Sequence, residues 1–146
     1  GTYQESGHLV SFGTFTTDSI TKQVTLGIGS LDLTQEDPEL KVVELQPFVE
    51  GEYVITGALS KHTNKVYFAY NHLWKVDPIT RHIEKKVPLS NTYFAPLVHP
   101  EGEKVYCGSN WSDVAVFDAD TLEELKKIPL GHSQTGGVSV LRFVDR

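Results

Sequence analysis

The chain has 146 residues, of which 39% are hydrophobic and 22% charged, with a formal net charge of −6 and a single cysteine. These values suit one soluble globular domain and exclude a disordered or collagen-like chain. The scattered Lys and Arg residues argue against a track for nucleic-acid phosphates. No apolar run approaches the roughly 20 residues of a membrane span, and the first residues lack the features of a signal peptide.

The N-terminal third predicts three long strands, at residues 9–16, 25–33 and 40–45. We interpret them as the second, third and fourth strands of an irregular first repeat that covers residues 1–46. The acidic connection Thr34–Glu39 lacks the spacing of a calcium-binding EF-hand loop. It is therefore expected to be a solvated turn.

The second repeat, residues 47–89, is regular and predicts four short strands separated by turn signals. The expected strands are Tyr53–Ser60, Lys65–Tyr70, Leu73–Val76 and His82–Leu89. The intervening turns are rich in Asn, Asp, Pro and Thr, residue types that favour turns through their fixed φ or their side-chain hydrogen bonds.

The third repeat, residues 90–130, is a copy of the second. Lys65-Val66-Tyr67 recurs as Lys104-Val105-Tyr106, and the segment 85–89 recurs at 126–130, in both cases about 40 residues later. Propensity alone would make residues 123–127 helical. The aligned stretch of the second repeat contains β-branched residues, so we predict a strand there instead. One further strand is expected at 137–144.

Four short strands every 40 residues or so predict an all-β fold made of β-propeller blades. The chain supplies about three and a half blades, and propellers need about four to eight. We therefore expect it either to be part of a longer polypeptide or to pair with a second half-ring that supplies the remaining blades. Apolar positions within 9–15 and 138–141 would otherwise be left uncovered.

The stretches KVYFAYNHLWKVDPIT and KVYCGSNWSDVAVFDADT resemble the Tyr-Val-Thr-Asn type of propeller repeat, although Cys107 and Gly108 stand in place of the naming residues. The order of elements over the whole chain, ending in YFAPLVHPEGEKVYCGSNWSDVAVFDADTLEELKKIPL and then VSVLRFVDR, is similar to the C-terminal part of the β subunit of quinohemoprotein amine dehydrogenases.

This resemblance implies a seven-bladed propeller in a periplasmic complex that oxidises primary amines to aldehydes. In that family the propeller subunit binds no cofactor, and it serves as a scaffold and as part of the wall of the amine pocket. Cysteine tryptophylquinone lies on a small subunit, and haem c lies on a dihaem cytochrome c subunit. Both subunits are expected as partners.

No residue is assigned a catalytic, cofactor-binding or metal-binding role in this chain. The six histidines form no local zinc pair, and the sequence has no Cys-x-x-Cys-His haem motif. Asp77 and Asp118 occupy equivalent positions, and we interpret both as turn-opening residues rather than as paired catalytic carboxylates. Cys107 lies in an apolar strand pattern and is expected to be a small core residue.

Four aromatic and histidine residues are candidates for an interface or for the lining of a pocket: Tyr53, Tyr93, Trp111 and His132. They lie in or beside the loops that enter the innermost strands, or in the turns expected on the same face of a propeller. The alternative is that Tyr53 and Tyr93 fill the central channel.

Two other functions stay open at this point. One is a stand-alone propeller that acts as a binding module in the periplasm or at the cell surface. The other is an autonomous enzyme on a propeller, such as a metal-dependent lactonase or hydrolase.

Overall fold

The computed structural model describes residues 2–4, 9–108 and 112–131. In this part of the chain every regular element is a strand, which confirms the predicted all-β class. No helix there is long and apolar enough to cross a membrane. The predicted strand at 137–144 lies outside the described residues.

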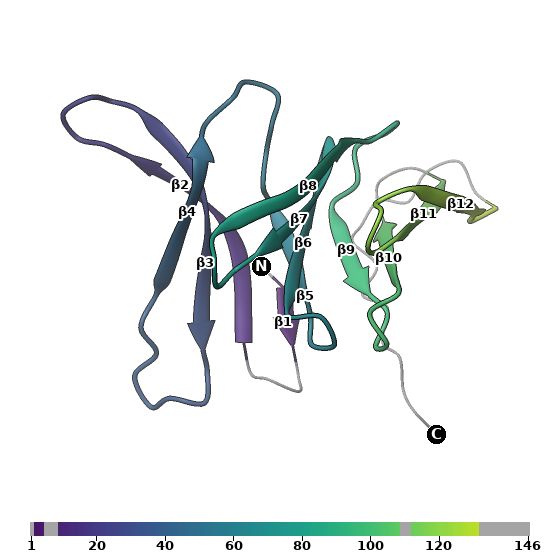
Figure 1. Cartoon of the computed structure of the whole chain (residues 1–146), viewed down its shortest axis with the longest axis horizontal. Coiled ribbons are helices and arrows are strands. Elements are labelled where there is room, and N and C mark those ends of the chain that lie inside the picture. Colours follow the sequence, from purple (N-terminus) through teal and green to yellow (C-terminus); the bar gives the residue numbers. More distant parts are fainter. Residues whose placement is uncertain (1, 5–8, 109–111, 132–146) are drawn as a thin grey trace.

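The strands form three successive groups that stand side by side (Figure 1). The first blade contains β1 (Thr2–Gln4), β2 (Leu9–Thr17), β3 (Val24–Asp32) and β4 (Lys41–Pro47). The second contains β5 (Thr56–Ser60), β6 (Lys65–Ala69), β7 (His72–Asp77) and β8 (His82–Pro88). The third contains β9 (Ala95–Val98), β10 (Lys104–Gly108), β11 (Asp113–Asp118) and β12 (Glu124–Pro129).

The second and third blades repeat each other in detail. In both, four antiparallel strands follow one another as neighbours in the sheet. An irregularity falls at the same place in both outer ladders, between Lys75 and Val76 in one and between Val116 and Phe117 in the other. The segment with helix propensity forms β12, as the alignment of the repeats predicts.

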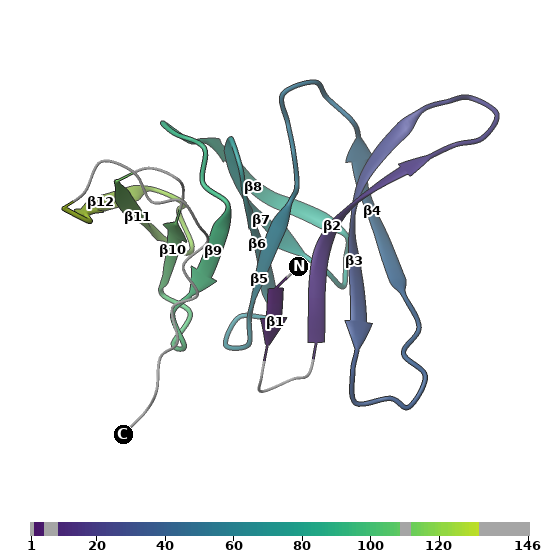
Figure 2. The ribbon, with the colours of Figure 1, turned by 180° about the vertical axis from the view of Figure 1, so that it is seen from behind.

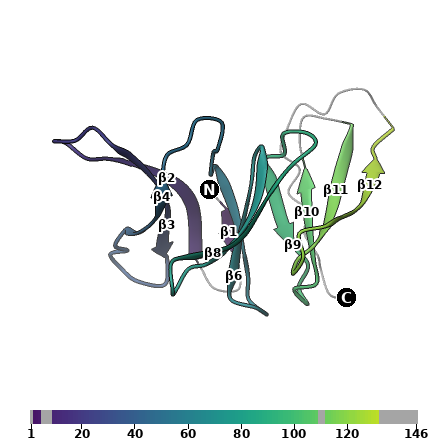
Figure 3. The same ribbon diagram turned by 45° about the horizontal axis from the view of Figure 1, so that its top comes forward.

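The first blade departs from this pattern. Its strands β2 and β3 have nine residues each, and the hairpin that joins them extends beyond the rest of the sheet (Figures 1 and 3). It is also joined to the second blade, because Phe12 of β2 pairs with Thr56 of β5 and the Gly13 N–H donates to the Ile55 carbonyl oxygen at 3.3 Å. The sequence does not predict this joint.

Gly13 explains why the two blades approach so closely. A Cβ atom at this position would lie 1.8 Å from the Val54 carbonyl oxygen, so only glycine fits. The first two blades therefore form a continuous sheet of eight strands, whereas the third blade forms a separate sheet of four. Figure 2 shows the same division from behind.

The core consists of two layers, each lying between neighbouring blades. The layer between blades 1 and 2 contains Leu26, Ile28, Val54, Val66, Phe68, Trp74 and Val76. The layer between blades 2 and 3 contains Tyr67, Ala69, Leu73, Tyr93, Val105, Cys107, Ala115, Phe117, Ala119 and Leu122. Because alternate residues of a strand face opposite sides, the middle blade contributes to both layers.

Asp77 and Asp118 are turn residues, as predicted. The Asp77 carboxylate accepts hydrogen bonds from the Ile79 and Thr80 backbone N–H groups at 2.9 and 3.0 Å. The Asp118 carboxylate accepts equivalent bonds at the turn between β11 and β12, from the Asp120 and Thr121 N–H groups.

The same turn occurs a third time, and the sequence analysis missed it. The Asp18 carboxylate accepts hydrogen bonds from the Ile20 and Thr21 N–H groups at the tip of the β2–β3 hairpin. In all three turns the residue after the threonine has a positive φ, close to 60°; these residues are Lys22, Arg81 and Leu122. A shared Asp-x-x-Thr pattern would have revealed the third copy.

Candidate functional site

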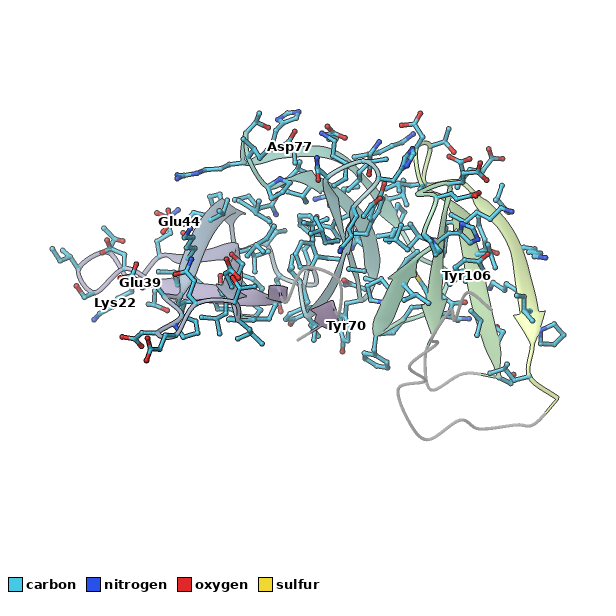
Figure 4. The ribbon with its side chains drawn as sticks, turned by 90° about the horizontal axis from the view of Figure 1, so that it is seen from below. Lys22, Glu39, Glu44, Tyr70, Asp77 and Tyr106 are labelled. Atoms are coloured by element: carbon cyan, nitrogen blue, oxygen red, sulfur yellow. The ribbon has the colours of Figure 1, made fainter. Side chains whose placement is uncertain are left out.

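The candidate site lies at the end of the blades that carries the loops entering β5 and β9. The structure brings the turn between β6 and β7 against these loops: the Tyr93 N–H donates to the Tyr70 carbonyl oxygen at 2.8 Å, and the Leu89 N–H donates to that of Asn71 at 3.0 Å. We call this the entry-loop face. The turn at Asp77 lies on the other side of the middle blade from Tyr70 (Figure 4).

Five aromatic rings follow one another along the entry-loop face and together make an aromatic row. Successive ring centroids are 5.3 to 6.1 Å apart, in edge-on or tilted contacts. Aromatic pairs favour such geometries because the edge of one ring is attracted to the face of the next. The members, in order, are Phe15, Phe48, Tyr53, Tyr70 and Phe94.

Of the four candidate residues, Tyr53 lies in the aromatic row and is partly exposed, between Phe48 and Tyr70. Tyr93 lies nearby but is fully buried in the layer between blades 2 and 3. Trp111 and His132 lie outside the described residues. An interface role for the four residues therefore stays a prediction, and in the described part Tyr53 is the candidate whose ring reaches the surface.

Tyr93 has a well-defined structural environment. Its hydroxyl donates to the Asp113 carboxylate at 2.9 Å. Burial, followed by this carboxylate, raises the pKa of Tyr93 to about 12, so the phenol stays protonated at neutral pH. The hydrogen bond satisfies the polar end of an otherwise apolar core residue.

Of the other four members of the aromatic row, Phe15, Tyr70 and Phe94 are not marked for this face by the sequence pattern. Phe15 belongs to the irregular first repeat, where no alignment suggests a common face, whereas Phe48 begins the loop that enters β5 in the second repeat. Phe15, whose ring contacts Phe48, is 50% exposed, and Val49, which follows Phe48 in the sequence, is 51% exposed. Exposed apolar side chains grouped in this way are typical of a surface that another molecule covers.

Charged groups brace the loop beside Tyr53. The Lys86 ammonium lies 2.6 Å from one Glu52 carboxylate oxygen, and the Gln46 amide donates to the other at 2.9 Å. The hydrogen bond from Lys86 is the main cause that lowers the pKa of Glu52. The same ammonium lies 4.9 Å from the centroid of the Trp74 ring, within range of a cation–π interaction.

The described residues contain no group of three His, Cys, Asp or Glu side chains that could hold a metal ion. Cys107 is fully buried, which confirms that it is a small core residue, and desolvation raises the pKa of its thiol well above the usual range. Trp74 and Cys107 lie in different core layers, so this indole and this thiol do not meet.

Comparison with known proteins agrees with the fold but gives no function. No protein-family model matches the chain, and no curated protein matches its sequence. Among solved structures, AztD from Citrobacter koseri matches with a TM-score of 0.53 at 14% identity, over 88% of this chain and 39% of AztD. The dihydro-heme d1 dehydrogenase NirN, in complex with DHE, matches with a TM-score of 0.50 at 15% identity, over 85% of this chain and 28% of NirN.

Both solved structures are β-propellers, and this chain spans less than two-fifths of either. At these identities the likeness carries the fold and nothing about activity. Together with the repeated four-stranded sheets, it identifies the chain as part of a β-propeller.

Proposed function

We propose that this chain is the non-catalytic propeller segment of a periplasmic complex similar to quinohemoprotein amine dehydrogenase. In this role it acts as a scaffold and forms part of the wall of the substrate pocket. The complex would oxidise primary amines to aldehydes on a small subunit that carries cysteine tryptophylquinone. A dihaem cytochrome c subunit would take the electrons.

The observation that supports this proposal best is the resemblance over the whole chain, which includes the irregular first repeat and the final VSVLRFVDR. The propeller fold is compatible with it, but many propellers have other functions. The aromatic row adds a second argument, because it gives the entry-loop face the partly exposed rings that are frequent at protein interfaces.

Co-expression with the genes that neighbour this one tests the proposal. We expect the chain to co-purify with a c-type cytochrome and a small quinone-bearing subunit, and the complex to oxidise primary amines. Tyr53→Ala should weaken the association about tenfold or more if Tyr53 is an interface anchor. Ile79→Ala is a matched control, because Ile79 is 80% exposed in the turn after Asp77, away from the entry-loop face.

Two results would contradict the proposal. One is a haem Soret band or a quinone absorption on the purified chain itself, since the proposal assigns both groups to partners. The other is a complete set of neighbouring genes without any cytochrome or small cross-linked subunit, which would favour a stand-alone binding module.

A further inference from the structure

The loop that carries Tyr53 is tied to the outer strand of the next blade by one charged contact. Glu52 lies just before Tyr53 in the connection between β4 and β5, whereas Lys86 lies on β8, at the far edge of blade 2. Their charged atoms are 2.6 Å apart, and the side chains are only 16% and 29% exposed. This contact therefore joins the loop between blades 1 and 2 to the outer strand of blade 2.

Each partner of this contact has further support. The Gln46 amide at the end of β4 holds the second Glu52 oxygen, and the Glu52 backbone N–H donates to the Val49 carbonyl oxygen at 3.0 Å. On the other side, Lys86 stacks over Trp74, which is fully buried between blades 1 and 2. Forming an ion pair costs less side-chain entropy when other contacts already hold both side chains than when both move freely.

The loop in question also sets the aromatic row. Tyr53 contacts Phe48 and Tyr70, with ring centroids 5.8 and 5.5 Å away. Phe48 and Tyr53 flank the turn that Glu52 closes, so a displacement of this turn would move the middle of the row. Tyr70 is held independently by the Tyr93 N–H, and it would stay in place.

We infer that Glu52 and Lys86 form a clasp that holds the 48–53 loop against blade 2 and thereby fixes the position of Tyr53 in the aromatic row. Glu52 and Lys86 are positioning residues in this view, because they act through Tyr53. The consequence for partner binding rests on the proposed function, whereas the clasp itself does not.

Amide hydrogen exchange on the full chain tests the clasp without any partner. Glu52→Gln keeps the shape of the side chain and removes its charge. Lys86→Met keeps an apolar stem over Trp74 and removes the ammonium group. In both variants the backbone amide hydrogens of residues 48–53 should exchange about tenfold faster. This factor corresponds to the loss of stability expected when a partly buried, charge-assisted contact is removed.

Lys85→Met is the matched control, since Lys85 is the exposed neighbour on the same strand and takes no part in the Glu52 contact. It should leave exchange in 48–53 unchanged. The double variant Glu52→Lys with Lys86→Glu reverses the pair and should restore most of the protection.

Exchange in 48–53 within twofold of the original chain for folded Glu52→Gln and Lys86→Met would overturn the clasp. If the single variants do not fold, the reversed pair decides: a folded and protected loop supports the clasp, and an unprotected or unfolded one refutes it. Failure of the chain to bind any partner subunit would contradict the proposed function. It would not affect the hydrogen-exchange result for the clasp.

Discussion

The two core layers between blades contain equivalent positions of the repeat. Large side chains occupy these positions in the first layer, and small side chains occupy them in the second. Facing blade 1, the middle blade offers the large Phe68 and Trp74. At the equivalent positions facing blade 2, the third blade offers the small Cys107 and Ala115. The opposing surfaces compensate, because blade 1 presents Leu26 and Ile28, whereas blade 2 presents Tyr67 and Leu73. The loop that enters blade 3 adds Tyr93 to the second layer.

The polar contacts across the two layers differ as well. Blades 1 and 2 share a strand pairing at Phe12 and the Glu52–Lys86 clasp. Blades 2 and 3 belong to separate sheets. Contacts between them include the hydrogen bond from the Tyr67 hydroxyl to the Ala119 carbonyl oxygen at 2.9 Å, the ion pair of Lys75 with Asp120 at 2.8 Å, and the hydrogen bond from the Tyr93 N–H to the Tyr70 carbonyl oxygen. A repeat in sequence therefore does not require the same interface between neighbouring blades.

The strongest way to break this comparison is Trp74→Ala, which makes the first layer resemble the second without the compensating aromatic residues. We expect a loss of about 3–5 kcal/mol in the free energy of unfolding, the range for truncating a large buried aromatic residue. Chemical denaturation measures it. A loss below about 1 kcal/mol would mean that Trp74 does not fill this layer.

Gly13→Ala tests the close approach of blades 1 and 2. The added Cβ would collide with the Val54 carbonyl oxygen, so β2 and β5 must separate, at a cost of about 1–3 kcal/mol. Gly108→Ala is the control, because a Cβ there meets nothing within 4 Å among the described residues. Equal stability of the two variants, again by denaturation, would show that the joint is looser than described.

Tyr67→Phe removes one hydrogen bond between blades 2 and 3 and leaves the apolar ring in place. The Ala119 carbonyl oxygen would lose this buried donor, and the expected loss is about 1–2 kcal/mol. Thermal unfolding with the original chain as reference measures it. An unchanged melting temperature would show that the hydrogen bond from Tyr67 to Ala119 adds nothing measurable to the joint between these blades.

The smallest expected effect is on how the stability of the chain depends on pH through Asp77. The Lys65 ammonium, with the Thr80 and Ile79 N–H groups, holds the pKa of the Asp77 carboxyl far below its usual range. A carboxyl with a depressed folded-state pKa adds stability above its unfolded pKa, about 3.9, and this stability is lost as the pH falls further.

Asp77→Asn should therefore be less sensitive to acid below about pH 4 than the original chain. Melting temperatures recorded from neutral pH to about pH 2.5 give the slope. Identical slopes for both proteins would contradict a stabilising role for the ionised Asp77.

The sequence predicted those features that depend on neighbouring residues. The turns at Asp77 and Asp118 follow from a side chain that bonds its own backbone two and three residues on, and the strands of blades 2 and 3 follow from alternation and repetition. A contact such as Glu52 with Lys86 joins residues 34 positions apart. It depends on the way blades pack, which no local pattern specifies.

The candidate site shows the same limit. Tyr53 and Tyr93 occupy equivalent positions in the repeat. Tyr53 lies in a row of partly exposed rings, whereas Tyr93 is buried and its hydroxyl donates to the Asp113 carboxylate. The difference comes from the loops around them, since the loop that enters β5 places Phe48 beside Tyr53. A joint such as the one at Gly13 is equally hidden, because a glycine in a strand pattern indicates close approach without naming the partner.

The three blades are part of a propeller, so the end blades should leave apolar side chains without a neighbouring blade. Leu40 and Val42 of blade 1 are 55% and 41% exposed, and Leu125 and Ile128 of blade 3 are 49% and 38% exposed. Light scattering on the purified 146-residue chain, together with binding of a hydrophobic dye, is the most direct test. We expect self-association or strong dye binding, because large apolar patches on a soluble protein mark an interface. A stable, well-folded monomer that binds no dye would contradict this expectation.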